Sequence, residues 1–134
     1  MSKLPVLVTG GAGYIGSHAV LALIDAGWPV AVIDDLSNGT RAIVPADVPF
    51  FEGDIADRRF VDGVLRDQGI GAIMHFAGSI VVPESVEKPL DYYRNNTLAS
   101  HALISAAVDE KTICLMPAST AAVTRAWLAR VLLR

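Results

Sequence analysis

Short apolar runs alternate along the chain with longer segments in which apolar residues recur at helical spacing. The runs, bounded by turn residues, predict buried strands at residues 4–8, 30–34, 50–51, 72–76 and 112–116. The periodic segments predict helices at 15–26, 58–67 and 90–108, the last with Pro89 at a first helical position. This alternation predicts an α/β fold, a doubly wound parallel sheet with right-handed crossovers and helices on both faces.

The first predicted strand leads directly into a glycine-rich turn. In a dinucleotide-binding turn, the chain bends sharply after the strand, lets a pyrophosphate touch its backbone, and then starts a helix close to the sheet. Each of these three features leaves no room for a side chain at one position. Gly10 or Gly11, Gly13 and Gly16 fill those positions. The helix beginning near Tyr14 then directs free N–H groups and a positive dipole end at the phosphates. Such a turn can also serve only tight packing, so the surrounding elements decide between the two interpretations.

The second predicted strand ends in Asp34. An acid roughly 20 residues beyond such glycines accepts hydrogen bonds from the ribose hydroxyls of adenosine. Because a carboxylate would repel a 2′-phosphate, its charge favours NAD over NADP. The alternative interpretation of Asp34 is a cap that starts the following loop.

Further candidate ligand groups follow the next two predicted strands. Asp54 and Ile55 follow the third, and residues 76–78 follow the fourth, where small residues let a flat nicotinamide or adenine ring lie against the backbone. Asn96, inside the long predicted helix, is expected to hydrogen-bond toward the same crevice. The structural alternatives are a turn former for Asp54, a plain loop for residues 76–78, and a solvated helix residue for Asn96.

Composition excludes several classes of protein. The 134 residues suit one domain, and 52% hydrophobic content with a mean hydropathy of +0.44 supports a buried core rather than disorder. The net charge of −3 shows no excess of basic residues of the kind that binds nucleic acid or an anionic membrane. Residues 4–24 carry no charged side chain, but four glycines interrupt them, so they read as strand and helix rather than a membrane span.

The single cysteine and the histidines add no metal or disulfide chemistry. Cys114 excludes an internal disulfide and fits a reducing compartment, so a cytoplasmic location is expected, with the thiol buried. His18, His75 and His101 lack metal-ligand spacing and are interpreted as structural or surface groups.

Five segments follow one another along the chain: VTGGAGYIGSH at 8–18, DDLSNGTR at 34–41, EGDI at 52–55, HFAGSIVVPESVEKPLDYYRNNT at 75–97 and STAAV at 119–123. Together and in this order they closely resemble the UDP-glucose 4-epimerase family of the extended short-chain dehydrogenase/reductase superfamily. The resemblance is almost without a gap over residues 5–111, and it implies a Rossmann-type sheet, an NAD-dependent isomerase of galactose and nucleotide-sugar metabolism, and a homodimer. In the family, hydride passes from C4 of the UDP-sugar to NAD and returns to the opposite face of the 4-keto sugar, which interconverts UDP-glucose and UDP-galactose.

The resemblance also implies which residues surround NAD. They are Gly10, Gly13, Tyr14, Ile15, Gly16, Asp34, Asp35, Leu36, Ser37, Asn38, Gly39, Asp54, Ile55, Phe76, Ala77, Gly78, Ser79, Ile80 and Asn96. It further aligns Thr120 with the hydroxyl residue that hydrogen-bonds the reacting sugar oxygen and relays its proton. The alternative for Thr120 is an ordinary helix cap or strand-end hydroxyl.

The chain departs from the family pattern in its later part. The family needs a Tyr-x-x-x-Lys pair as catalytic base, and none of Lys3, Lys88 and Lys111 lies four places after a tyrosine. The half that binds the UDP-sugar is also missing, so we expect a chain that is inactive alone. Two other hypotheses stay open: an NAD(H)-binding module without catalysis, and a subunit completed by a partner chain that supplies the Tyr/Lys pair.

The expected domain is an incomplete NAD-binding Rossmann domain at residues 1–123, truncated after about the fifth strand. Pro117 would remove a ladder donor from that strand. The tail at 124–134 resembles nothing in the family. It is either a helix with Trp127 and Val131 on one face, suited to docking or a membrane surface, or the product of a shifted reading frame.

Overall fold

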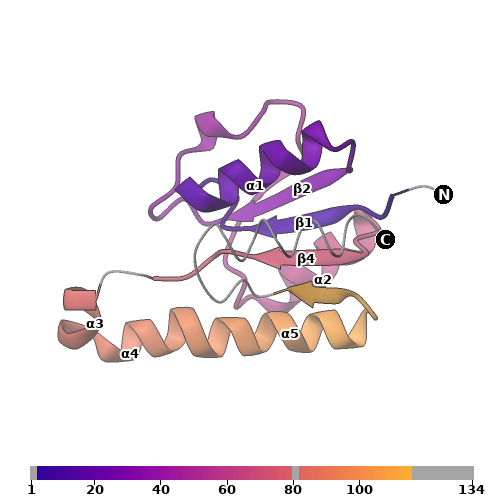
Figure 1. Ribbon diagram of the computed structural model, residues 1–134. Helices are drawn as coiled ribbons and strands as arrows, with labels where there is room; N and C mark the ends of the chain where they lie inside the picture. Colours follow the sequence, from indigo (N-terminus) through magenta and orange to yellow (C-terminus); the bar gives the residue numbers. More distant parts are fainter. Residues whose placement is uncertain (1–2, 80–81, 116–134) are drawn as a thin grey trace.

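The computed structural model describes residues 3–79 and 82–115. Within them, five parallel strands form one sheet in the order β3-β2-β1-β4-β5 (Figure 1). The strands are β1 (Val6–Thr9), β2 (Val30–Asp34), β3 (Phe50–Glu52), β4 (Ala72–His75) and β5 (Ile113–Leu115). The chain builds outward from β1 to β3 and then returns to place β4 on the other side of β1, which confirms the predicted doubly wound sheet.

Helices cover both faces of this sheet, with α1 (Tyr14–Asp25) on one face and α2 (Arg58–Asp67) and α5 (Ala99–Asp109) on the other (Figure 1). The other helical segments are η1 (Arg41–Ile43), α3 (Val82–Glu87), α4 (Pro89–Tyr92) and η2 (Tyr93–Leu98). Side chains alternate between the faces of β1: Val6 and Val8 join the core beneath α1, and Leu7 joins the core beneath α2 and α5. Because strands of this kind are buried on both faces, they appear in the sequence as continuous apolar runs.

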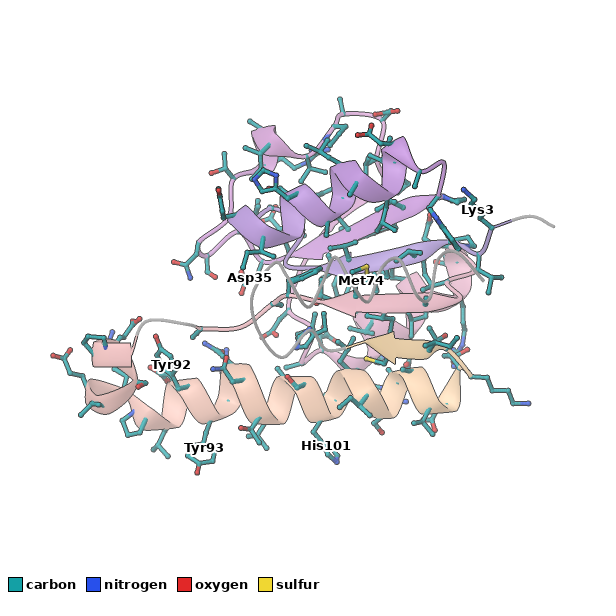
Figure 2. All side chains as sticks on the ribbon, in the orientation of Figure 1. Lys3, Asp35, Met74, Tyr92, Tyr93 and His101 are labelled. Carbon is teal, nitrogen blue, oxygen red and sulfur yellow. The ribbon has the colours of Figure 1, made fainter. Side chains whose placement is uncertain are left out.

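The long helix predicted at 90–108 is one helical run with an irregular middle. Between α4 and α5, η2 is a π-helical turn, which no apolar periodicity signals. The buried side of α5 is made of small residues around one leucine, namely Ala99, Ser100, Leu103, Ala106 and Ala107. Its outer side is exposed, and Tyr93 and His101 project from the run away from the sheet (Figure 2).

Most predicted boundaries agree with the structure. The strand at 30–34 and the helix at 58–67 match their predictions, and α2 is capped by Asp57, whose Oδ1 accepts from the Phe60 N–H at 3.2 Å. The first strand reaches Thr9, one residue beyond its prediction, and the fourth ends at His75, one residue short. Differences of this size are usual at element ends, where hydrogen bonding rather than burial sets the limit.

Several predictions concern parts of the chain outside the described residues. These are the predictions for Ile80, Pro117 and Thr120, the domain boundary at 123 and the tail at 124–134. Among residues 3–79 and 82–115, no helix combines the length and apolar character needed to cross a membrane.

Candidate functional site

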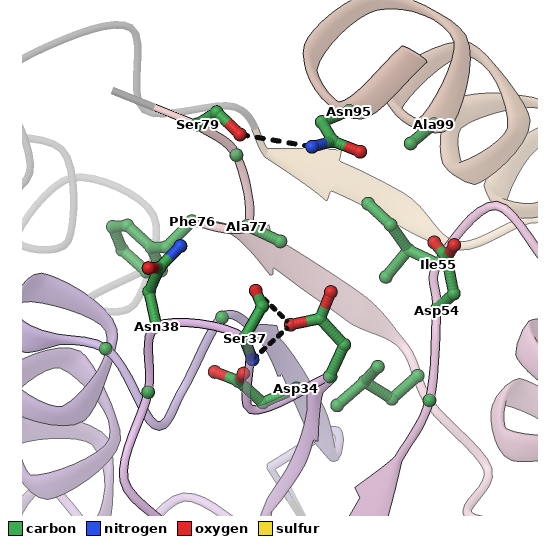
Figure 3. Close-up of a pocket in the computed structure, with 17 residues that line it drawn as sticks. Asp34, Ser37, Asn38, Asp54, Ile55, Phe76, Ala77, Ser79, Asn95 and Ala99 are labelled. Carbon is green, nitrogen blue, oxygen red and sulfur yellow. Dashed lines mark hydrogen bonds between the residues drawn. The ribbon is translucent and has the colours of Figure 1, made fainter. Parts of the chain in front are cut away.

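A cleft opens at the carboxyl ends of the strands, where the strand order reverses on either side of β1 (Figure 3). It is lined by Gly10, Gly13, Ile33, Asp34, Asp35, Ser37, Asn38, Gly39, Gly53, Asp54, Ile55, Phe76, Ala77, Gly78, Ser79, Asn95 and Ala99. Thirteen of these were expected from the sequence to surround a cofactor: all except Ile33, Gly53, Asn95 and Ala99. Tyr14, Ile15, Gly16, Leu36 and Asn96, also expected there, do not line it.

The chain after β1 is packed so tightly that neither Gly10 in the turn nor Gly16 in the first turn of α1 can carry a side chain. Gly10 has φ +69°, and a Cβ on it would lie 2.7 Å from the Ala77 nitrogen. A Cβ on Gly16 would lie 2.1 Å from the Gly10 oxygen. The first turn of α1 therefore sits directly on the glycine turn, and that turn presses against the segment that follows β4.

The N-terminus of α1 opens on the cleft through Gly13. The Gly13 N–H donates to the Gly10 oxygen at 3.1 Å, and the first intrahelical bond runs from the Ser17 N–H to the Gly13 oxygen at 2.9 Å. No acidic residue occupies the first turn, so no side-chain charge there offsets the positive end of the helix dipole. Tyr14 and Ile15 turn their side chains outward, with 81% and 48% exposure, so only their main-chain N–H groups can serve an anion here.

Asp34 takes the loop-starting role that the sequence offered as one interpretation, while its role toward a ribose stays a prediction. Its side chain is only 8% exposed; Oδ2 accepts from the Ala12 N–H at 2.9 Å, and Oδ1 accepts from the Leu36 N–H at 2.8 Å. The carboxylate therefore starts the loop after β2 and also ties that loop to the glycine turn. Each carboxylate oxygen has a further lone pair, so Asp34 retains acceptor capacity toward hydroxyl groups in the cleft.

The loop after β2 is shaped by a second aspartate. Asp35 Oδ1 accepts from the Ser37 N–H at 2.9 Å and from Ser37 Oγ at 2.7 Å. Leu36 has φ +60°, an unusual conformation for a branched residue, and its side chain packs into the core beneath α1. Leu36 therefore supports the loop through its side chain, and its expected place beside the cofactor stays a prediction.

Asp54 and Ile55 close the cleft on the β3 side. Asp54 Oδ1 accepts from the Ala56 N–H at 2.9 Å, which is the turn-forming role, while Oδ2 lies 3.7 Å from Arg94 Nη2. Asp54 stays half-exposed in the cleft, whereas Ile55 is 7% exposed and belongs mainly to the core.

His75 links β1, β4 and α5 behind the cleft. Its Nδ1 lies 2.6 Å from Thr9 Oγ1, and its Nε2 lies 3.0 Å from Ser100 Oγ. Burial lowers the pKa of His75 from 6.5 to about 4, because the charged imidazolium would lose its hydration. The ring is therefore neutral at pH 7 and acts as a structural residue, in agreement with the sequence-based interpretation.

The segment after β4 is held by two neighbouring asparagines. Asn96 accepts from the Ser79 N–H at 2.7 Å and donates to the Ser79 carbonyl at 2.8 Å. Asn95 donates to Ser79 Oγ at 3.1 Å and lines the cleft (Figure 3). The cleft therefore receives Asn95 rather than Asn96, because the register of the π-helical turn, which the sequence pattern does not reveal, decides which of the two faces it.

Metal and thiol chemistry find no support in the part of the chain that the structure describes. No group of three or more His, Cys, Asp or Glu residues there is placed to hold a metal ion. Cys114 is half-buried, and burial raises the pKa of its thiol, as for an unreactive cysteine.

Comparison with known proteins places this cleft in context. The model of the NAD dependent epimerase/dehydratase family matches residues 6–125. The UDP-glucose 4-epimerase of Azospirillum brasilense is 59% identical over 118 residues, covering 88% of this chain and 34% of that protein. The enzyme of Lactobacillus helveticus is 48% identical over 119 residues, covering 89% of this chain and 36% of that protein.

Solved structures show the same likeness. The Thermus thermophilus UDP-glucose 4-epimerase in complex with NAD superposes with a TM-score of 0.79 and 39% identity, covering 81% of this chain and 35% of that one. The Bifidobacterium longum UDP-glucose 4-epimerase in complex with NAD+ and UDP superposes with a TM-score of 0.81 and 31% identity, covering 87% of this chain and 37% of that one. The chain thus spans about a third of the length of the relatives it matches.

Proposed function

This chain belongs to the NAD dependent epimerase/dehydratase family, and we propose that it is the NAD-binding part of a UDP-glucose 4-epimerase. The observation that carries the proposal is the buried carboxylate of Asp34, which faces the cleft beside the glycine turn at the reversal of strand order. The similarity to UDP-glucose 4-epimerases over about a third of their length supports the assignment.

The residues present fit a dinucleotide. The turn at Gly10 and Gly13 leaves backbone open to a pyrophosphate, and the main-chain N–H groups at the start of α1 would hold it. Asp34 would accept the hydroxyls of the adenosine ribose, and the backbone of Ala77 and Gly78 offers a flat wall to a ring. NAD, when bound, supplies a reversible acceptor for the hydride of the sugar.

The substrate of the whole protein is then a UDP-sugar, with UDP-glucose and UDP-galactose as the interconverted pair. Solved structures of relatives hold UDP-glucose in one case and NAD+ with UDP in another, which supports this substrate class. The proton of the sugar hydroxyl needs a base, and the 134 residues contain no Tyr-x-x-x-Lys pair. We therefore propose that the chain alone binds NAD without epimerising, and Thr120 stays a prediction for the hydroxyl beside the reacting oxygen.

Two further proposals concern assembly and location. On the outer side of the helical run from α4 to α5, the residues Tyr93, Leu98 and Val108 are 63–70% exposed to solvent. They form an apolar face suited to a second copy of the chain in a homodimer. Sedimentation equilibrium that finds only monomer would contradict it. A cytoplasmic location is supported by the single cysteine, which can form no internal disulfide.

Titration calorimetry of the purified chain with NAD and with NADP tests the proposed function. We expect NAD to bind and NADP to bind at least about tenfold more weakly, because a 2′-phosphate would meet the Asp34 carboxylate. Equal affinities would overturn the assignment of Asp34. In parallel, a coupled assay should detect no conversion of UDP-galactose by the chain alone; turnover at rates typical of the family would show that it supplies a base of its own.

A further inference from the structure

The segment at residues 76–79, here called the post-β4 segment, forms one wall of the cleft beyond the end of the sheet. The Phe76 N–H donates to the Thr9 oxygen at 2.9 Å, which continues the sheet pattern for one more residue. The Ala77 N–H is already 3.5 Å from Thr9 Oγ1, a weak contact. The wall at Ser79 therefore needs support from outside the sheet.

For the main chain of Ser79, that support comes from the side chain of Asn96. The Asn96 carboxamide bonds both main-chain groups of Ser79, accepting from the N–H at 2.7 Å and donating to the carbonyl at 2.8 Å. An amide has one acceptor side and one donor side, so it replaces a neighbouring peptide group. A Cβ on Gly78 would lie 3.0 Å from Asn96 Oδ1, so the carboxamide lies close against the backbone of the segment.

The π-helical turn explains how Asn96 reaches Ser79 while Asn95 reaches the cleft. In a regular α-helix, adjacent residues point about 100° apart, which separates their targets. In η2 the turn is wider, and both asparagines bond Ser79, Asn95 through its Oγ and Asn96 through its main chain. Turns of this type are rare in helices and often occur at functional sites.

We propose that Asn96 is a positioning residue: it does not line the cleft but fixes the Ser79 main chain, and through it the wall against which the nicotinamide half of the dinucleotide lies. The inference rests on the proposed function. Asp34 ends β2 and the post-β4 segment follows β4, with β1 between the two strands. A dinucleotide across this reversal point places one half on each side, and Asp34 takes the adenosine half. Asn96 therefore matters for NAD and not for AMP.

The experiment compares Asn96→Leu and Asn96→Ala with the wild-type chain by calorimetric titration of NAD and of AMP. Both variants remove the two hydrogen bonds at an exposed position, and leucine keeps the approximate size of asparagine. We expect NAD affinity to fall about tenfold in both variants, the usual effect of one or two such bonds, with AMP affinity unchanged within about twofold. Unchanged AMP binding shows that the variants fold.

A matched control separates the proposed role from general disturbance of the helix. Thr97→Ala changes an exposed residue of the same π-helical turn and should leave both affinities as in wild type.

The outcomes distinguish this inference from the proposed function. A wild-type chain that binds AMP but not NAD overturns both. A wild-type chain that binds NAD, with Asn96 variants that bind it equally well, overturns the positioning role alone. An equal loss of NAD and AMP binding in the variants overturns it too, because it would mean that Asn96 supports the whole domain rather than one wall.

Discussion

The two walls of the cleft are held by different kinds of group. On the β1–β2 side, main-chain atoms meet other main-chain atoms where glycines leave room, and Asp34 bonds the N–H groups of Ala12 and Leu36. On the β4 side, hydrogen bonds from side chains hold the wall. His75 bonds the hydroxyls of Thr9 and Ser100, and Asn96 bonds the main chain of Ser79. The first wall depends on the absence of side chains at its glycines as well as on Asp34, and the second depends on polar side chains.

The difference predicts different failures. A side chain added to a glycine on the β1–β2 side should lower the stability of the fold, because the backbone there is already in close contact. Removing or charging a polar group on the β4 side should lower the stability of the fold, because a buried polar atom would lose its hydrogen-bond partner. The three changes below test this contrast.

The largest effect is expected for Gly16→Ala. A Cβ there would lie 2.1 Å from the main-chain oxygen of Gly10, so the helix and the turn must separate. We expect the free energy of unfolding to fall by about 3 kcal/mol, measured by urea denaturation. Gly63→Ala in α2 is the matched control: a Cβ there meets nothing within 4 Å, and the stability should rise by about 0.5–1 kcal/mol. A tolerated Gly16→Ala would show that this side is not limited by space.

The next effect is a pH dependence of stability that arises from His75. Its pKa is about 4 in the folded chain against 6.5 when exposed, so the unfolded chain binds the proton more readily between these values. The stabilisation is complete above pH 6.5 and should decrease by about 3 kcal/mol as the pH falls to 4.

His75→Asn, which stays neutral over this range, should flatten the curve of unfolding free energy against pH. His18→Asn, at an exposed position, should leave the wild-type slope unchanged. If His75→Asn retains the full slope, the β4 side does not depend on a neutral imidazole, and this half of the contrast is wrong.

The smallest change is expected for Asp34→Ala, which acts on binding. We expect NAD affinity to fall by about 1–3 kcal/mol, the range for hydrogen bonds to a charged group, and the preference over NADP to narrow. Titration calorimetry measures both. Asp35→Ala is the matched control, because Asp35 bonds only within its own loop in the described contacts, to Ser37. Equal losses from the two variants would contradict the assignment of the ribose to Asp34.

The amino-acid sequence alone determined the architecture and the glycine side of the cleft. Apolar runs and helical spacing predicted the strand at 30–34 and the helix at 58–67 with their observed bounds. The glycines and Asp34 were identified because their chemistry is specified locally: no other residue type fits a crowded turn, and an acid at a strand end faces the ligand edge of a parallel sheet.

Only the tertiary structure decided which neighbouring polar residues face the cleft. Asn95 and Asn96 are identical in type and adjacent, so their roles follow from the π-helical register and from the position of Ser79, 17 residues before Asn96. In the same way, the positive φ of Leu36 turns its side chain into the core although the residues around it line the cleft. A hydrophobic pattern records which face of an element is buried, but the direction of a single polar side chain depends on contacts between segments that meet only in the folded chain.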